Sequence, residues 1–154
     1  MKKILKGFMA LALSLSMFCS CGKKESDVSA DKLLSAAVDS GAKFEEMEVV
    51  DGEYIKFYYE IEESWYEEFA AKAAGDTALA DEVVVVKASD DEALKKIQEA
   101  LEKRVKDRKE VLQSYAPVEY DKLCDSEVKT EGDYVYLVVG SEGNKAEKAL
   151  EKLF

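Results

Sequence analysis

The segment DEVVVVKA, residues 81 to 88, constrains the fold of this chain more than any other feature. Its four consecutive valines have branched side chains that favour extended backbone, so the segment is predicted to be a β-strand. The apolar residues do not alternate with polar ones, and this lack of alternation indicates a strand that is buried on both faces. We therefore expect this strand in the core of the fold.

An amphipathic helix is predicted directly after this strand. Ser89 and Glu92 have the S-x-x-E spacing of a capping box, in which two side chains bond the first free N–H groups of a helix. Apolar side chains then recur at helical spacing, with Arg108 as the one polar residue among them. These apolar positions are Leu94, Ile97, Leu101, Val105, Leu112 and Tyr115. The helix is expected to end near Tyr115, because Pro117 cannot continue it.

Shorter elements are predicted on both sides of this strand and helix. In chain order they are a helix over residues 30–40 that Ser29 caps, an extended segment over 44–50, a β-hairpin over 128–139 that turns at Gly132, and a last helix from Asn144. The aromatic segment EYIKFYYEI, residues 53–61, is open between helix and strand. Residues 30–154 are expected to form a single domain.

The N-terminal residues have the pattern of a bacterial lipoprotein signal. Three lysines within the first six residues precede an apolar run of about a dozen residues, which is too short to cross a membrane. The stretch FCSC, residues 18–21, resembles a lipobox, although its first position is more often aliphatic than Phe. The resemblance implies cleavage before Cys21 and diacylation of its sulfur, which would anchor the chain on the extracytoplasmic face of the cell membrane. The alternative is an ordinary secreted protein that is cut nearby.

Removal of the signal peptide makes the chain more acidic. We divide the chain into a signal peptide (1–20), a flexible tether (21–29) and the domain (30–154). The full chain has a net charge of −11 at pH 7, and loss of residues 1–20, which hold three lysines and no acidic residue, makes it −14. This charge repels nucleic acid and anionic lipid headgroups. We therefore expect no nucleic-acid partner, and contact with the membrane through the lipid on Cys21.

From about Glu60 onward the order of the motifs resembles a known family. The DEVVVVKA strand, the capped helix, a P-x-x-Y connector and the hairpin EVKTEGDYVYLVVG are similar to the domain of unknown function family 4358, found in lipoproteins of Firmicutes, mostly clostridia. The resemblance implies an α+β fold: an antiparallel sheet of about four strands, with the long helix and the C-terminal helix packed on one face. It also suggests an accessory role beside a membrane-bound O-acyltransferase that acylates a cell-surface polymer.

The segment SWYEEFAAKAAG, residues 64–75, supports two conflicting predictions. Ser64 and Glu67 have capping-box spacing and alanines follow them, which favours a helix. The family resemblance implies instead a strand, in which residues 68–74 pair with residues 82–87 across a short turn. Helix propensity is weak and tertiary context overrides it, so we prefer the strand.

The residue types exclude several kinds of catalysis. The chain has no His, which removes Ser-His-Asp and Cys-His catalysis, and no glycine-rich phosphate loop. Acidic residues cluster at 60–68 and 90–92, but a chain with 33 acidic residues produces such clusters by composition. No D-x-D-x-D-G calcium loop is present. We predict no catalytic residue, cofactor or metal site; the alternative is a hydrolase that uses two carboxylates on wall glycan.

Aromatic side chains crowd the segment 54–66. They are core residues, or they form an exposed patch that binds a sugar or a protein partner. The candidate patch consists of Tyr54, Tyr58, Tyr59, Trp65 and Tyr66. Cys124, the one thiol left after processing, is either a buried apolar residue or a reactive one. The sequence thus predicts a non-catalytic binding or accessory module of the cell envelope, with an envelope protein such as an O-acyltransferase as partner.

Overall fold

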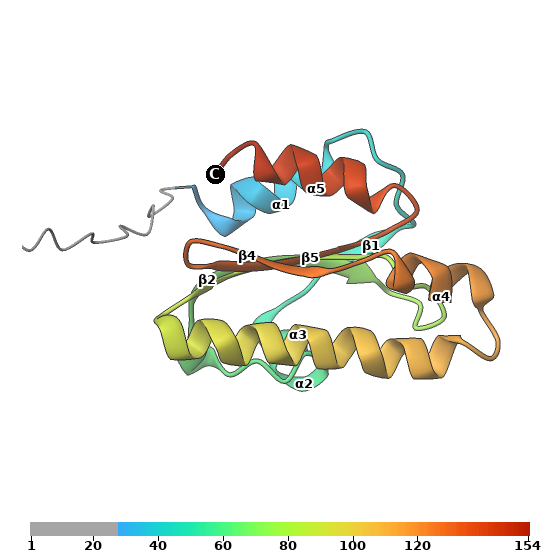
Figure 1. Cartoon of the computed structure of the whole chain (residues 1–154), viewed down its shortest axis with the longest axis horizontal. Coiled ribbons are helices and arrows are strands. Elements are labelled where there is room, and N and C mark those ends of the chain that lie inside the picture. Colours follow the sequence, from blue (N-terminus) through green and yellow to red (C-terminus); the bar gives the residue numbers. More distant parts are fainter. Residues whose placement is uncertain (1–27) are drawn as a thin grey trace, which may run out of the picture.

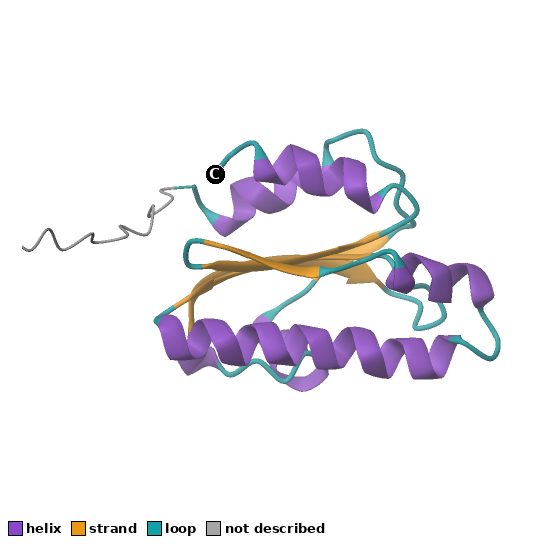
Figure 2. Ribbon diagram, in the orientation of Figure 1, coloured by secondary structure: helices purple, strands orange, loops and turns teal. Residues whose placement is uncertain are grey.

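A five-stranded antiparallel sheet lies between two layers of helices in the computed structural model, which describes residues 28–154 (Figure 1, Figure 2). The elements in chain order are α1 (Ala30–Val38), β1 (Met47–Val49), α2 (Gly52–Tyr58), a short 3-10 turn η1 (Glu63–Trp65), β2 (Tyr66–Ala74), β3 (Glu82–Ala88), α3 (Asp91–Leu112), α4 (Pro117–Cys124), β4 (Val128–Glu131), β5 (Tyr134–Val139) and α5 (Gly143–Glu151). The strand order β1-β2-β3-β5-β4 places β3 at the centre. The predicted α+β class is confirmed.

The central strand β3 is buried on both faces, as its four valines predicted. Val84 and Val86 belong to the core cluster under α2 and α3, whereas Val83 and Val85 belong to the cluster under α1 and α5. All four valines are fully buried. Full burial of each valine stabilises the fold by roughly 1.5–3 kcal/mol, so this strand is a main source of stability.

Helices cover both faces of the sheet, and the expectation that the long helix and the C-terminal helix share one face is wrong. In Figure 1, α2 and α3 lie on one side of the sheet and α1 and α5 on the other. Ile97 of α3 packs in the cluster of Val84, whereas Leu33 of α1 and Leu150 of α5 pack in the cluster of Val83. Successive side chains of a strand point to opposite faces, so a run of valines requires a cover on each face. The sheet has five strands rather than about four, because the short β1 joins its edge by pairing with β2.

Most of the segment 64–75 is strand β2, as preferred from the family resemblance, while Ser64 and Trp65 belong to η1. β2 pairs with β3 in antiparallel register, with Glu68 opposite Lys87 and Ala73 opposite Glu82. Four of its alanines are buried, at positions 70, 71, 73 and 74. Burial in the sheet therefore outweighs their helix propensity.

The start of α3 differs from the predicted capping box. The N-cap is Asp90, whose carboxylate Oδ1 accepts hydrogen bonds from the N–H groups of Glu92 and Ala93 at 2.9 and 2.8 Å. The hydroxyl of Ser89 instead donates to the carbonyl of Trp65 at 3.2 Å. The predicted capping box does not form, because Asp90 caps the helix and Ser89 instead bonds Trp65 of η1.

Two further segments are resolved by local signals. The ambiguous segment 53–61 contains most of helix α2, which begins because Asp51 accepts a hydrogen bond from the N–H of Tyr54 at 2.8 Å. Helix α3 ends at Leu112, slightly before the predicted end. Pro117 then opens α4, where its missing N–H removes no helical hydrogen bond.

The remaining predicted elements are confirmed as α1, β1, the β4–β5 hairpin and α5. Ser29 caps α1 as predicted, and Gly132 has the positive φ of 57° that the hairpin turn requires. The signal peptide, Cys21 and most of the tether lie outside the described residues. Within residues 28–154, no helix is both long enough and apolar enough to span a membrane.

Candidate functional site

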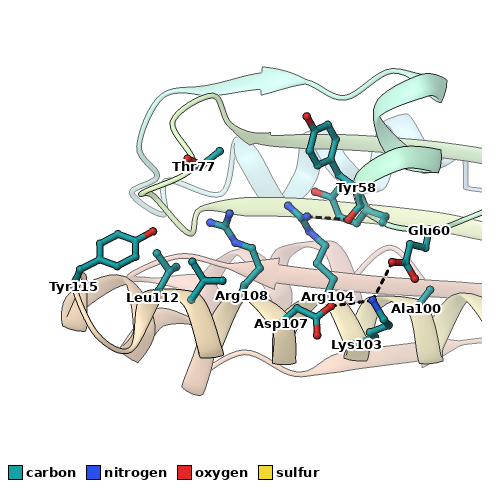
Figure 3. Close-up of a pocket in the computed structure, with 12 residues that line it drawn as sticks. Tyr58, Glu60, Thr77, Ala100, Lys103, Arg104, Asp107, Arg108, Leu112 and Tyr115 are labelled. Carbon is teal, nitrogen blue, oxygen red and sulfur yellow. Dashed lines mark hydrogen bonds and ion pairs between the residues drawn. The ribbon is translucent and has the colours of Figure 1, made fainter.

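A pocket of about 230 Å³ opens between the end of α2, the helix α3 and the loop that joins β2 to β3 (Figure 3). We call it the α2–α3 pocket. Helix α3 supplies most of its wall because Ala100, Arg104, Arg108 and Leu112 are spaced four residues apart and therefore share one helix face. Thr77 faces α3 from the β2–β3 loop. The pocket thus combines charged, aromatic and aliphatic side chains from three separate parts of the chain.

Arg104 is neutralised by a buried carboxylate behind the pocket. Its Nε and Nη2 each lie 2.8 Å from Oε2 of Glu82, and the hydroxyl of Tyr59 donates to the same oxygen at 2.6 Å. Its Nη1 donates to the carbonyl of Tyr58 at 3.1 Å. The guanidinium also lies 3.8 Å from the ring centre of Tyr59. We call these side chains the Arg104–Glu82–Tyr59 network; it joins α2 and α3 to the central strand.

Burial and charge shift the pKa values in this network. Burial lowers the pKa of Arg104, but the Glu82 carboxylate outweighs this effect, so the net pKa lies above its ordinary value. Burial, and secondly the charge of Glu82, raise the pKa of Tyr59 well above 10.0. Arg104 therefore stays charged and Tyr59 stays neutral, which makes the network a fixed structural unit.

Lys103 occupies one side of the pocket, together with two acidic side chains. Its Nζ lies 2.9 Å from Oε1 of Glu60 and 2.9 Å from Oδ2 of Asp107. Hydrogen bonds to Asp107 and then to Glu60 raise the pKa of Lys103. Glu60 has a positive φ of 57°, which is uncommon outside glycine and turns the chain from α2 toward the buried Ile61. The charge of Lys103 is thus fully compensated.

Arg108 differs from the other two cations of the pocket. Its Nη2 donates to the carbonyl of Leu79, and its buried Nε has no hydrogen-bond partner in the described part of the chain. Within residues 28–154, it forms no ion pair, although Lys103 and Arg104 on the same helix each pair with a carboxylate. Arg108 is therefore the uncompensated cation among the side chains that line the pocket.

The structure brings together only part of the predicted aromatic patch. Tyr54 and Tyr58 stack with ring centres 4.4 Å apart, and Tyr58 is 58% exposed at the pocket. Tyr59 lines the pocket but is 1% exposed, so its assignment to an exposed patch is wrong. Trp65 and Tyr66 are half-buried and do not line this pocket. Near them, Lys96 lies 5.7 Å above the Trp65 ring.

Of the residues that line the pocket, only Tyr58 and Tyr59 were predicted as site residues, and three of the others show why. Arg108 had a detectable signal, because a lone arginine interrupts the apolar face of a long helix. Tyr115 was expected on the buried face, but it is 58% exposed. Thr77 had no signal, since only the path of the β2–β3 loop brings it opposite α3.

A second group of buried charges lies at the same end of β3, around Asp81, which directly precedes Glu82. Nζ of Lys122 lies 2.5 Å from Oδ2 of Asp81 and 2.9 Å from Oε1 of Glu119. The other Asp81 oxygen accepts the N–H of Glu45 at 3.3 Å. Every charge in this group has a partner, so it fastens α4 to the sheet.

Cys124 is a free and exposed thiol, so of its two alternatives the buried apolar residue is wrong. It is the last residue of α4. Among residues 28–154, no group of three or more potential metal ligands (Cys, Asp or Glu in this chain) could hold a metal ion. The thiol therefore belongs to no candidate metal site in the described part of the chain.

Together these features define an α+β domain with two helical layers and one small pocket that carries an uncompensated arginine. The chain belongs to the family described as "Domain of unknown function (DUF4358)", whose sequence model matches residues 25–140. This confirms the resemblance, and the match extends further toward the N-terminus than the segment from Glu60 on which the resemblance was based. Comparison with curated proteins and with solved structures found no match.

Proposed function

We propose that this protein is a non-catalytic binding module of the bacterial cell envelope, anchored by lipid on Cys21, and that the α2–α3 pocket is its binding site. The observation that carries this proposal is the pocket itself. It combines the exposed ring of Tyr58 with the uncompensated guanidinium of Arg108. Exposed aromatic and arginine side chains are the residue types that dominate binding energy at interfaces.

The side chains of the pocket suit binding better than hydrolysis. A glycosidase needs two carboxylates that flank the bond, one of them a carboxylic acid in an apolar environment. Glu60 and Asp107 both contact the ammonium of Lys103, and both side chains are more than half exposed. Glu82 lies buried behind Arg104. The hydrolase alternative therefore has no pair of suitable carboxylates in this pocket.

The position of the pocket supports a role away from the membrane surface. The described chain begins at Val28, on the side of the sheet that carries α1, and the pocket lies on the side that carries α3 (Figure 1). Six residues separate Cys21 from Val28, and the seven steps from one residue to the other span at most about 25 Å. A lipid anchor on Cys21 would hold the α1–α5 layer near the bilayer and leave the pocket accessible to another envelope component. An O-acyltransferase system for a cell-surface polymer is the partner that the family resemblance suggests.

Site-specific photo-crosslinking in intact cells tests this function. The full chain would carry a photoreactive amino acid in place of Tyr58 or, as a control on the opposite layer, in place of the exposed Lys148 of α5. We expect position 58 to capture one discrete envelope component, and Tyr115→Ala to abolish that capture. Position 148 should capture nothing of the same mass. Capture that is equal at the two positions, or absent at position 58, would contradict the proposal.

Membrane fractionation tests the anchor separately. The Cys21→Ala variant should leave the membrane fraction, because the lipid supplies the membrane affinity of an acidic chain. An unchanged distribution of this variant would refute the lipid anchor and would leave the pocket untouched as a binding site.

A further inference from the structure

We infer that the α2–α3 pocket binds a small organic carboxylate, whose carboxylate group pairs with Arg108 and whose apolar body lies against Tyr58, Val111 and Tyr115. This inference rests on the proposed function and names the chemical class of the ligand. Its first support is the state of Arg108. Its second support is the size and composition of the surrounding wall.

The pairing of charges around the pocket leaves Arg108 as the lining cation without a carboxylate partner among residues 28–154. Lys103 contacts two carboxylates and Arg104 contacts Glu82, whereas the one polar partner of Arg108 within residues 28–154 is the carbonyl of Leu79. Its Nε lies buried without a hydrogen-bond acceptor, which is an unfavourable state for a charged donor. The chain has 33 acidic residues, yet none within residues 28–154 pairs with this guanidinium. Nε itself is out of reach of a ligand, but an anionic ligand in the pocket would pair with the outer nitrogens of the guanidinium and neutralise its charge.

The surroundings select a carboxylate rather than a phosphate. The planar guanidinium can form two parallel N–H bonds to a carboxylate or to a phosphate, so the neighbouring charges decide between them. Lys103 and Arg104 are already neutralised, so they do not stabilise a second negative charge. Glu60 and Asp107 line the same pocket and would repel a dianion. A single negative charge therefore fits the pocket better than two.

The walls predict the rest of the ligand. Tyr58, Val111 and Tyr115 each leave 58% of their surface exposed at the pocket, and Leu112 lies buried beneath them. Thr77 faces them from the opposite loop, where its hydroxyl is available as a polar contact. The volume of about 230 Å³ is below the range of typical drug-sized sites. We therefore expect a short acyl or single-ring body on the carboxylate.

Calorimetric titration of the full chain in detergent micelles tests the ligand class. The probes are benzoate and hexanoate, their neutral amides benzamide and hexanamide, and inorganic phosphate. We expect saturable binding of at least one carboxylate, with its amide about tenfold weaker or worse and phosphate weaker than the carboxylate. Equal binding of acid and amide, preferential binding of phosphate, or no binding of any probe at about 10 mM would overturn the inference.

A matched pair of variants assigns the binding to Arg108. Arg108→Gln should weaken carboxylate binding about tenfold or more, whereas Lys106→Gln, which removes an exposed cation of the same helix outside the pocket, should leave it within about twofold. Wild-type affinity of Arg108→Gln would overturn the assignment. If Arg108→Gln does not fold, the comparison of acid with amide on the unmodified chain still tests whether the pocket binds a carboxylate.

Capture from position 58 without carboxylate binding would refute the ligand class and leave the proposed function standing. Carboxylate binding without capture would refute the envelope role.

Discussion

Replacement of Arg104 by Gln tests the energetic role of the Arg104–Glu82–Tyr59 network. The side chain of Glu82 is 2% exposed and that of Arg104 is 10% exposed, so the pair is almost completely removed from water. The variant leaves the Glu82 carboxylate with the Tyr59 hydroxyl as its remaining partner. Removal of one partner of a buried ion pair costs about 3–5 kcal/mol, because the other charge stays buried and unpaired. We expect a loss of stability of this size.

The adjacent Lys103 provides the matched control. Its ion pairs with Glu60 and Asp107 are exposed, and such pairs contribute about 0–1 kcal/mol. Urea unfolding of the full chain measures both variants. With an m-value of about 2 kcal/mol per molar urea, Arg104→Gln should lower the midpoint by about 1.5–2.5 M, and Lys103→Gln by less than about 0.5 M.

A double variant separates the loss of the charge pair from a general disruption. Arg104→Met combined with Glu82→Leu removes both charges, and it should recover most of the stability that Arg104→Gln loses. If Arg104→Gln unfolds at the same urea concentration as Lys103→Gln, the network does not act as a buried ion pair and this reasoning is refuted.

Three further predictions follow from the packing and the titrating groups. Gly140→Ala should lower stability by about 1–3 kcal/mol in thermal unfolding, because an added Cβ would lie 2.7 Å from the ring of Phe44; a neutral substitution would contradict this. Burial, and then the neighbouring carboxylates, raise the pKa values of Tyr134 and Tyr136 above 10.0, so the unfolded chain ionises these phenols first. The stability that the two neutral phenols contribute should therefore be fully present below about pH 10 and be lost above it. Tyr134→Phe should flatten this loss in urea midpoints measured against pH. Cys124 should react with a thiol reagent in the absence of denaturant, whereas a thiol that reacts only in urea would contradict its exposure.

The valines of β3 show how far residue patterns alone predict this fold. Their lack of alternation indicated burial on both faces, and the structure confirms it. The arrangement with both helices on one face came from the family resemblance instead, and it conflicts with that pattern. Val83 and Val85 would then have no cover, so the local pattern was the better guide.

Helix starts were harder to predict, because two adjacent residues can both be suitable N-caps. Ser89 and Asp90 are both good caps, and the choice depends on the contact of Ser89 with Trp65, which is distant in the sequence. Tyr58 and Tyr59 present the same difficulty at the end of α2. They are adjacent in the sequence, yet one is 58% exposed and the other 1% exposed, and an aromatic cluster does not reveal which ring faces the core.

Only the part of the pocket that α3 forms could be predicted from the sequence. Arg108 stands out as a charged residue at an apolar position of the helix. Leu79, which accepts a hydrogen bond from Arg108, and Thr77, which lines the same pocket, come from the β2–β3 loop, a segment without helix or strand signals. Contacts between such distant segments depend on the assembled sheet, so the sequence alone does not place them.

Hydrogen exchange of the full lipidated chain, measured with and without isolated cell envelope, tests the central claim most directly. The claim is that the α2–α3 pocket is the binding surface of this protein. Binding there should slow exchange in residues 58–60, 75–80 and 104–115, and leave exchange in α1 and α5 unchanged. Protection confined to α1 and α5, or no protection anywhere in residues 28–154, would contradict the claim.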